Sequence, residues 1–128
     1  MNKTEKKAMG LVKKFCFKNK AKDVSKEGIG ADLQIGHKFI EVKGVAEKNP
    51  VDFRIYKTAI KLINSKKDKY YVYVVYNIWR EPKLLKLNKR IIRKNLKKSK
   101  QKDCYQILGI RNLIQSEKLK SSYLRKFN

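Results

Sequence analysis

Residues 30–44, GADLQIGHKFIEVKG, contain two short runs of strand-forming residues around a glycine. The runs are residues 31–35 and 38–43, and Gly36 with His37 forms the loop between them. Glycine at the first position of a two-residue loop suits a type II′ turn, because φ is positive there. The sequence therefore predicts a tight β-hairpin.

The register of this hairpin determines where its charged side chains lie. With a two-residue loop, Ile35 pairs with Lys38. Counting back along the ladder then puts Asp32 directly opposite Glu41, with Cβ atoms about 4.5–5.5 Å apart. Side chains two residues apart on a strand share a face, so Lys43 projects beside Glu41. Two carboxylates at this spacing repel each other unless something lies between them.

A divalent cation would turn that repulsion into attraction. Mg²⁺ is usually held by one or two carboxylates together with substrate phosphate and water. Lys43 can orient or help deprotonate the attacking water and stabilise negative charge as a phosphorus atom becomes five-coordinate. The pattern favours a Mg²⁺ or Mn²⁺ site at Asp32 and Glu41 for phosphodiester hydrolysis. The simpler alternative is an ion pair on a solvated strand.

The charge balance indicates a polyanionic partner. The chain has 128 residues, with 34 Lys and Arg against 11 Asp and Glu, and a formal net charge of +23. Self-repulsion at this charge destabilises a compact chain unless an anion screens it. We expect nucleic acid and no membrane partner. The competing explanations are the lysine enrichment that an AT-rich genome imposes and, less favoured, an anionic membrane surface.

The interval from Lys86 to Lys102 is the most basic part of the chain, with nine basic residues and no acid. Contacts between such residues and phosphates fix the position of a nucleic acid without reading its sequence. The alternative is a solvated lysine face. The predicted phosphate-binding residues are Lys89, Arg90, Arg93, Lys94, Lys97 and Lys98.

A first helix is predicted from Thr4, its capping residue, to about residue 19, because apolar residues recur there at helical spacing. Glu5 lies three and four residues before Ala8 and Met9, which puts it on the apolar stripe. A lone acid there is costly without a partner. A metal site under the helix would provide one, and fraying at an exposed helix start is an equal alternative.

The remaining pattern predicts a mixed α/β domain, a central mixed sheet flanked by helices. Its length suits a single domain over residues 1–128. The tyrosines at 70, 71, 73 and 76 are assigned to the core and not to base stacking. The elements are a helix over about residues 52–65, a central strand over 69–79, an edge strand over 84–87, a short helix near 91–96, a strand over 104–110 and an amphipathic tail over 112–127.

Two cysteines, Cys16 and Cys104, lack a CxxC companion and are assigned to packing in a reducing cytoplasm. No apolar run is long enough to span a membrane, and the lysine-rich N-terminus lacks the features of a secretory signal. We therefore expect a soluble, cytoplasmic protein. His37 has no nearby partner in the sequence and is assigned to the surface.

Three motifs carry a resemblance to a known family. They are Asp23-Val24-Ser25, Gly30-Ala31-Asp32 and Ile40-Glu41-Val42-Lys43-Gly44. The Asp and Glu-x-Lys pattern resembles the PD-(D/E)XK nuclease superfamily, and the three motifs together are most similar to its NO VEIN C-terminal-like domain. The likeness covers about residues 3–87 and leaves residues 88–128 as a basic C-terminal extension.

The resemblance implies a restriction-endonuclease-like core and a role for each site residue. Asp32 and Glu41 would be metal ligands, the Val42 carbonyl a third, and Lys43 the catalytic lysine. Glu5 corresponds only loosely to the acid that the family carries on its first helix. The hairpin is short and no proline precedes the first acid, but neither departure removes a catalytic group.

The function implied is that of a Mg²⁺- or Mn²⁺-dependent endonuclease acting on DNA, with branched or other non-canonical DNA as candidate substrates and RNA left open. The alternative is a catalytically silent DNA- or RNA-binding module of the same fold. A ribosome-associated basic protein is a third class. A homodimer is compatible with such nucleases, although the sequence carries no interface signature.

Overall fold

A computed structural model describes residues 2–98, 104–107 and 122–123 of the protein. Its helices are α1 (Lys3–Phe15), the 3₁₀ helix η1 (Phe17–Asn19), α2 (Lys57–Asn64) and α3 (Lys89–Lys94). Its strands are β1 (Lys22–Asp23), β2 (Leu33–Ile35), β3 (Lys38–Gly44), β4 (Phe53–Tyr56), β5 (Lys69–Tyr76), β6 (Lys83–Asn88), β7 (Leu96–Lys98), β8 (Cys104–Ile107) and β9 (Ser122–Tyr123).

The central sheet confirms the predicted mixed α/β class. Five strands run in the order β1-β2-β3-β5-β6, and the two-residue β9 adds a sixth at the β6 edge. β3 and β5 are parallel, while the other neighbours are antiparallel. A parallel pair needs a crossover connection, and β4 with α2 provides it. β4 also belongs to a three-stranded sheet of order β4-β8-β7.

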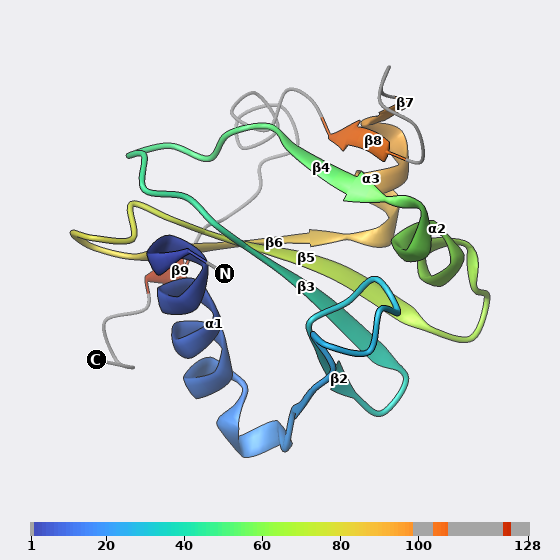
Figure 1. Ribbon diagram of the computed structural model, residues 1–128, viewed down its shortest axis with the longest axis horizontal. Coiled ribbons are helices and arrows are strands. Elements are labelled where there is room, and N and C mark those ends of the chain that lie inside the picture. The colour runs from blue at the N-terminus through green and yellow to red at the C-terminus, as the bar shows by residue number, and fades with distance from the viewer. Residues whose placement is uncertain (1, 99–103, 108–121, 124–128) are drawn as a thin grey trace.

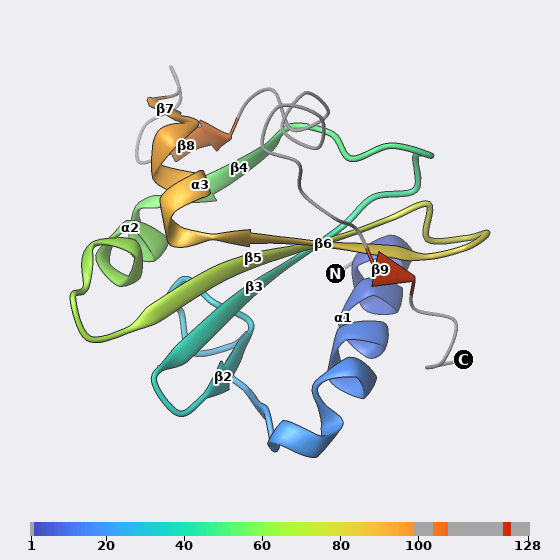
Figure 2. The same ribbon diagram turned by 180° about the vertical axis from the view of Figure 1, so that it is seen from behind.

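The central sheet lies between two layers, as Figures 1 and 2 show from opposite sides. α1 packs on one face, where Val12, Ile40 and Tyr73 are almost fully buried. α2, α3 and the small sheet cover the other face, over residues such as Val72 and Val74. Because β5 is buried on both faces, it has almost no polar residues, as predicted for a central strand.

The first helix begins and ends earlier than predicted. Its N-cap is Asn2, whose side-chain oxygen accepts a hydrogen bond from the Glu5 N–H at 2.8 Å, and not Thr4. It ends at Phe15, and residues 17–19 form a single 3₁₀ turn. Asparagine and threonine are both good capping residues, so composition alone does not choose between them.

The second helix was predicted over residues 52–65, but residues 53–56 form β4 and the helix begins at Lys57. In FRIY, apolar and polar residues alternate, and Ile55 is buried beside Ile107 in the same core. The pairing of β4 with β8 joins residues about fifty positions apart, so the local pattern did not reveal it.

The later elements are helices and strands where predicted but differ in their bounds, and β6, predicted as an edge strand, has β9 paired beyond it. The central strand ends at Tyr76, and Asn77 follows with a positive φ of 53°. α3 ends at Lys94, so Leu96, predicted to be helical, begins β7. β8 covers residues 104–107 of the predicted strand. Of the predicted tail, the structure describes only residues 122–123, as a strand.

Most single-residue predictions about burial hold. Cys16 is a buried free thiol, His37 is exposed, and three of the four tyrosines are buried. Tyr71 is the exception, because it is only partly buried. Within the described part of the chain, no helix is both long enough and apolar enough to cross a membrane.

Candidate metal and catalytic site

The hairpin has the predicted register. Ile35 pairs with Lys38 and Leu33 with Ile40, where the ladder ends. Asp32 does not continue it directly opposite Glu41, as predicted, because the Asp32 N–H donates to the Ile40 carbonyl, but the Asp32 carboxyl group still reaches that of Glu41. Positive φ occurs at Gly36, at 58°, and not at the next residue, as a type II′ turn requires.

Asp32 lies just beyond the end of β2 and takes over its pairing with β3. Its N–H donates to the Ile40 carbonyl at 2.9 Å, and its Oδ2 accepts a hydrogen bond from the Val42 N–H at 2.7 Å. A carboxylate that accepts from a backbone N–H is held in one orientation. The side chain of Asp32 is therefore fixed at the edge of β3 where β2 has ended.

Gly30 explains how the loop before Asp32 reaches this edge. Its φ is +89°, and a Cβ at this position would lie 2.4 Å from the backbone N of Ala59 in α2. Its carbonyl accepts a hydrogen bond from the Tyr70 hydroxyl at 3.0 Å. Only glycine combines that conformation with so close an approach. The Gly-x-Asp motif thus clamps the loop between α2 and β5.

Asp23 and Ser25 fasten the start of the same loop. Asp23 Oδ1 accepts hydrogen bonds from the Ser25 N–H at 3.0 Å and the Ser25 hydroxyl at 2.6 Å, and Oδ2 lies 2.6 Å from Lys13 Nζ in α1. The bond from Lys13, followed by those from Ser25, lowers the pKa of Asp23 well below its usual value. The Asp23-Val24-Ser25 motif therefore has a structural role, which was not predicted from the sequence.

Gly44, the last residue of the Ile40–Gly44 motif, lets α1 lie directly on β3. A Cβ at Gly44 would be 2.8 Å from both the Ala8 Cβ and the Thr4 carbonyl oxygen. This contact brings the first turn of α1, with Glu5, to the end of β3. The glycine after the Glu-x-Lys motif therefore positions the helix that borders the site.

A pocket of about 230 Å³ lies at this meeting point. Glu5 reaches its rim, although Glu5 is exposed and does not lie on the buried stripe as predicted, since the buried positions of α1 begin at Ala8. The pocket brings together all four predicted catalytic residues and the predicted carbonyl donor. Its lining is Glu5, Met9, Asp32, Glu41, Val42, Lys43 and Gly44.

The two central carboxyl groups are electrostatically strained. Burial raises the pKa of Glu41 to about 9, and a hydrogen bond with Asp32 and repulsion by the Asp32 charge act in the same direction. Lys43 Nζ lies 4.0 Å from Glu41 Oε2 and opposes this shift only in part. At neutral pH the pair therefore holds one proton between its two carboxyl groups, where a divalent cation would otherwise balance the charge.

The Val42 carbonyl faces the same open edge. A residue in a strand directs its N–H and C=O to the same neighbour, and the Val42 N–H points to Asp32. Because β2 ends at Leu33, no β2 residue pairs with Val42. The carbonyl is thus directed toward Asp32, as a third oxygen donor would be.

These oxygen donors suit an open Mg²⁺ or Mn²⁺ site better than a closed structural site such as that of zinc. Across residues 2–98, 104–107 and 122–123, no three His, Cys, Asp or Glu side chains gather closely enough to hold an ion by themselves. Two carboxylates and a carbonyl leave positions for water and phosphate, as Mg²⁺ requires. A structural zinc site would need four protein ligands.

The predicted phosphate-binding residues divide into two groups. Lys89 Nζ donates to the carbonyls of Ser65 at 2.5 Å and Asp68 at 2.6 Å, and Arg93 donates to the Ile63 carbonyl at 2.7 Å. Arg93 therefore caps the C-terminal end of α2, and Lys89 bridges the turn between α2 and β5. Arg90, Lys94 and Lys97 are exposed. The side chain of Lys98 lies outside the described part.

The chain was compared with known proteins. The family model described as Protein NO VEIN, C-terminal, matches residues 1–87, which include both carboxylates and the lysine of the pocket. Residues 88–128 lie beyond the match. Neither the curated proteins nor the solved structures gave a match to this chain.

The raised pKa of Glu41 predicts a pH-dependent stability. The folded state keeps a proton on Glu41 between pH 4.5 and about 9, where the unfolded state has lost it. This contribution is full below pH 4.5 and is lost as pH rises through 9. In metal-free buffer, the parent's Tm should therefore fall from pH 5 to 9 more steeply than that of Glu41→Gln, as measured by circular dichroism.

Adding Mg²⁺ at pH 8 should raise the Tm of the parent and leave that of Glu41→Gln unchanged, because a neutral amide is a poor ligand for a hard cation. Equal pH slopes for the two proteins would mean that Glu41 is not protonated in the folded state.

The contact of Gly44 with α1 predicts opposite effects for two glycine substitutions. Gly44→Ala should lower the free energy of unfolding by about 1–3 kcal/mol, because the new methyl group meets Ala8 and a backbone carbonyl. Gly10 lies in α1, and an added Cβ there would have nothing within 4 Å. Gly10→Ala should therefore raise the free energy of unfolding by about 0.5–1 kcal/mol. Urea unfolding measures both, and equal effects would refute the close packing at Gly44.

Proposed function

The chain belongs to the family of the C-terminal domain of Protein NO VEIN, and from that premise we propose that it is a metal-dependent nuclease of the PD-(D/E)XK superfamily with a restriction-endonuclease-like core. The observation that carries the proposal is the Asp32–Glu41 pair with Lys43 beside it in one pocket. A surface ion pair would not explain two carboxyl groups buried against each other.

Each residue has a distinct part in the proposed reaction. Asp32, oriented by the Val42 N–H, and Glu41 would hold Mg²⁺ or Mn²⁺ with the Val42 carbonyl. The bound ion would lower the pKa of a coordinated water and polarise the phosphoryl oxygens. Glu41 must release its proton before it can bind the ion, so metal affinity should rise with pH.

Lys43 supplies the positive charge on the other side of the reacting phosphate. Its side chain is 27% exposed, and Nζ lies 4.0 Å from Glu41 Oε2 and 5.9 Å from the centre of the Phe53 ring. These neighbours restrain the ammonium group at the pocket. There it can orient the attacking water and stabilise the charge of the five-coordinate phosphorus.

DNA is the favoured substrate, and RNA is the alternative. The net charge of +23 supports a nucleic acid of either kind, since both present phosphates to the lysines. The preference for DNA, including branched forms, rests on the proposed superfamily. Fold analogy is a weaker reason than site chemistry.

The competing function is a binding module of the same fold that carries out no chemistry. Such a protein would not need a carboxyl group whose pKa is raised by burial and by an adjacent acid, because burying two acids against each other costs stability. The presence of Asp32, Glu41 and Lys43 in one pocket favours the enzyme.

Cleavage assays test the proposal. With labelled duplex, single-stranded and branched DNA, and RNA, the parent should cut in Mg²⁺ and not in EDTA. Glu41→Gln and Lys43→Ala should each lower the single-turnover rate by about 10²–10³-fold, because each removes a group that stabilises charge in the transition state.

Lys22 and Glu27 provide a matched control, since they form a lysine–glutamate pair on the surface at 3.9 Å. Lys22→Ala and Glu27→Gln should cut at the parental rate. Cleavage in EDTA, or equal rates for Glu41→Gln and the parent, would refute the nuclease. Salt-sensitive binding of DNA without any turnover would establish the silent module instead.

A further inference from the structure

The α1-facing side of the central sheet extends past the end of α1. Along β5, Lys69, Tyr71 and Tyr73 point to this side, because alternate residues of a strand share a face. α1 ends at Phe15, whose ring lies 6.4 Å from the buried ring of Tyr73. Tyr71, two residues nearer the start of β5, is only partly buried. An aromatic ring is thus partly accessible on the part of this face that α1 does not cover.

Lysines surround this ring. The strand register puts Lys38 of β3 next to Lys69, and Lys86 of β6 next to Tyr73. Lys38 Nζ lies 4.8 Å from the centre of the Tyr71 ring, and Lys86 Nζ lies 5.4 Å from that of Tyr73. Cation–π contacts hold these ammonium groups near the rings. The face therefore presents positive charges at defined positions.

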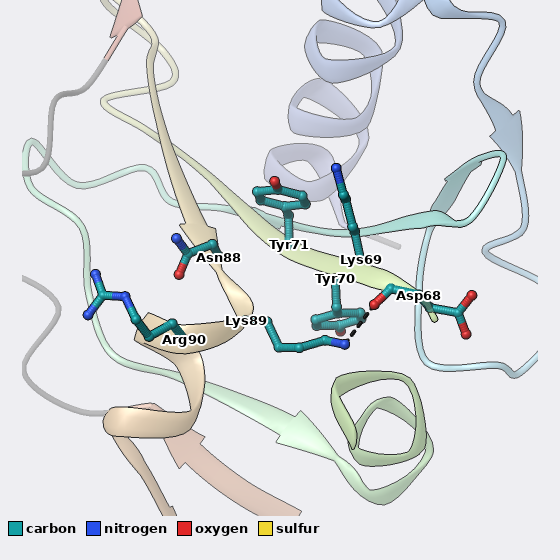
Figure 3. Close-up of a pocket in the computed structure, with 7 residues that line it drawn as sticks. All are labelled: Asp68, Lys69, Tyr70, Tyr71, Asn88, Lys89 and Arg90. Atoms are coloured by element: carbon teal, nitrogen blue, oxygen red, sulfur yellow. Dashed lines mark hydrogen bonds between the residues drawn. The ribbon is translucent and has the colours of Figure 1, made fainter. Parts of the chain in front are cut away.

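Asp68, the residue before β5, has its carboxylate turned away from this face. The Asp68 carboxylate accepts a hydrogen bond from the Ser65 hydroxyl at 2.8 Å and lies 3.4 Å from His37 Nδ1. In Figure 3 it points away from Tyr71, while Lys69 and Tyr71 project together on the other side of the strand. Lys38 and Lys69 form no ion pair with any described residue.

A pocket of about 230 Å³ lies beside Tyr71. It forms because β6 ends at Asn88, opposite Tyr71, while β5 continues back to Lys69. Asn88 Oδ1 accepts a hydrogen bond from the Ile91 N–H at 3.0 Å, which fixes the amide group beside the pocket (Figure 3). The pocket thus combines the Tyr71 ring, the Asn88 side chain and two lysines, Lys69 and Lys89, at a size that suits one flat polar group.

We propose that this face binds an unpaired strand of nucleic acid. A base enters the pocket and stacks on Tyr71 as the Lys38 ammonium moves from the ring to a phosphate, and Lys69 and Lys86 bind neighbouring phosphates. Proteins that bind single strands combine aromatic platforms and lysines in this way. A duplex keeps its base faces stacked inside, so it would engage only the lysines.

This surface is distinct from the catalytic pocket. Glu41 and Lys43 lie on the opposite face of β3 from Lys38, because they are an odd number of residues away. Binding at Tyr71 therefore needs neither metal nor catalysis. Only the further step, that the bound strand is an unpaired region of the substrate to be cut, rests on the proposed nuclease.

Fluorescence anisotropy of the full chain in EDTA tests the binding, with labelled oligothymidylate and a hairpin duplex as probes. Tyr71→Leu should weaken binding of the single strand by about 5- to 150-fold and that of the duplex little, because one stacked base is lost. Tyr71→Phe keeps the ring and should bind within about twofold of the parent. Lys69→Gln, at an exposed position, should reduce the salt slope by about 0.7.

Trp79→Leu is the matched control. Trp79 is 53% exposed and lies under Lys7, at the far end of β5, so its loss should leave binding unchanged. Glu41→Gln should bind the single strand as the parent does, which separates this inference from the nuclease. Parental binding by both Tyr71→Leu and Lys69→Gln, or a loss seen equally with Trp79→Leu, would overturn the proposal.

The same variants are tested with anionic phospholipid vesicles. If Tyr71→Leu and Lys69→Gln lost binding to the vesicles but not to oligothymidylate, the proposal would be overturned, since the lysines would then serve a membrane surface. Circular dichroism of each variant establishes that it is folded before its affinity is compared with that of the parent.

Discussion

The site depends on the repulsion between two carboxyl groups that the hairpin forces together. Asp32 and Glu41 meet across a two-residue turn, and burial denies them the solvent that would screen their charges. In the metal-free state a proton on Glu41 relieves the repulsion. In the proposed nuclease, a divalent cation would replace that proton and balance the charge of both acids. The same arrangement would be a pure cost in a protein that binds no metal.

The rest of the fold serves to hold this pair in place. Gly30 lets the loop approach α2 closely enough for Asp32 to reach the edge of β3, and Gly44 lets α1 lie on the other end of that strand. β3 itself is fixed by its parallel pairing with β5, which is buried on both faces. Because β2 ends at Leu33 while β3 continues to Gly44, a pocket lined by Asp32, Glu41 and Val42 opens beside β3. The position of the pocket therefore follows from where β2 stops.

The large positive charge is divided between two tasks. Arg93 donates to a carbonyl in the last turn of α2, where the unpaired acceptors of a helix C-terminus favour basic groups, and Lys89 donates to two carbonyls of the turn that follows. Lys38, Lys69 and Lys86 instead border the rings of Tyr71 and Tyr73, on the face of the sheet that carries α1. A count of basic residues along the chain does not separate these tasks, because both kinds of lysine occur in equally basic sequence.

The sequence by itself determined the hairpin, its register and the meeting of Asp32, Glu41 and Lys43, because a two-residue turn and the alternation of a strand are local rules. It also determined that β5 is central, from its nearly unbroken run of apolar and aromatic residues. Only the tertiary structure decided that residues 53–56 pair with β8, that Glu5 is exposed at the rim of the pocket, and that Tyr71 emerges from the core. These depend on which distant segment covers each surface, and that is set by packing between elements far apart in the chain.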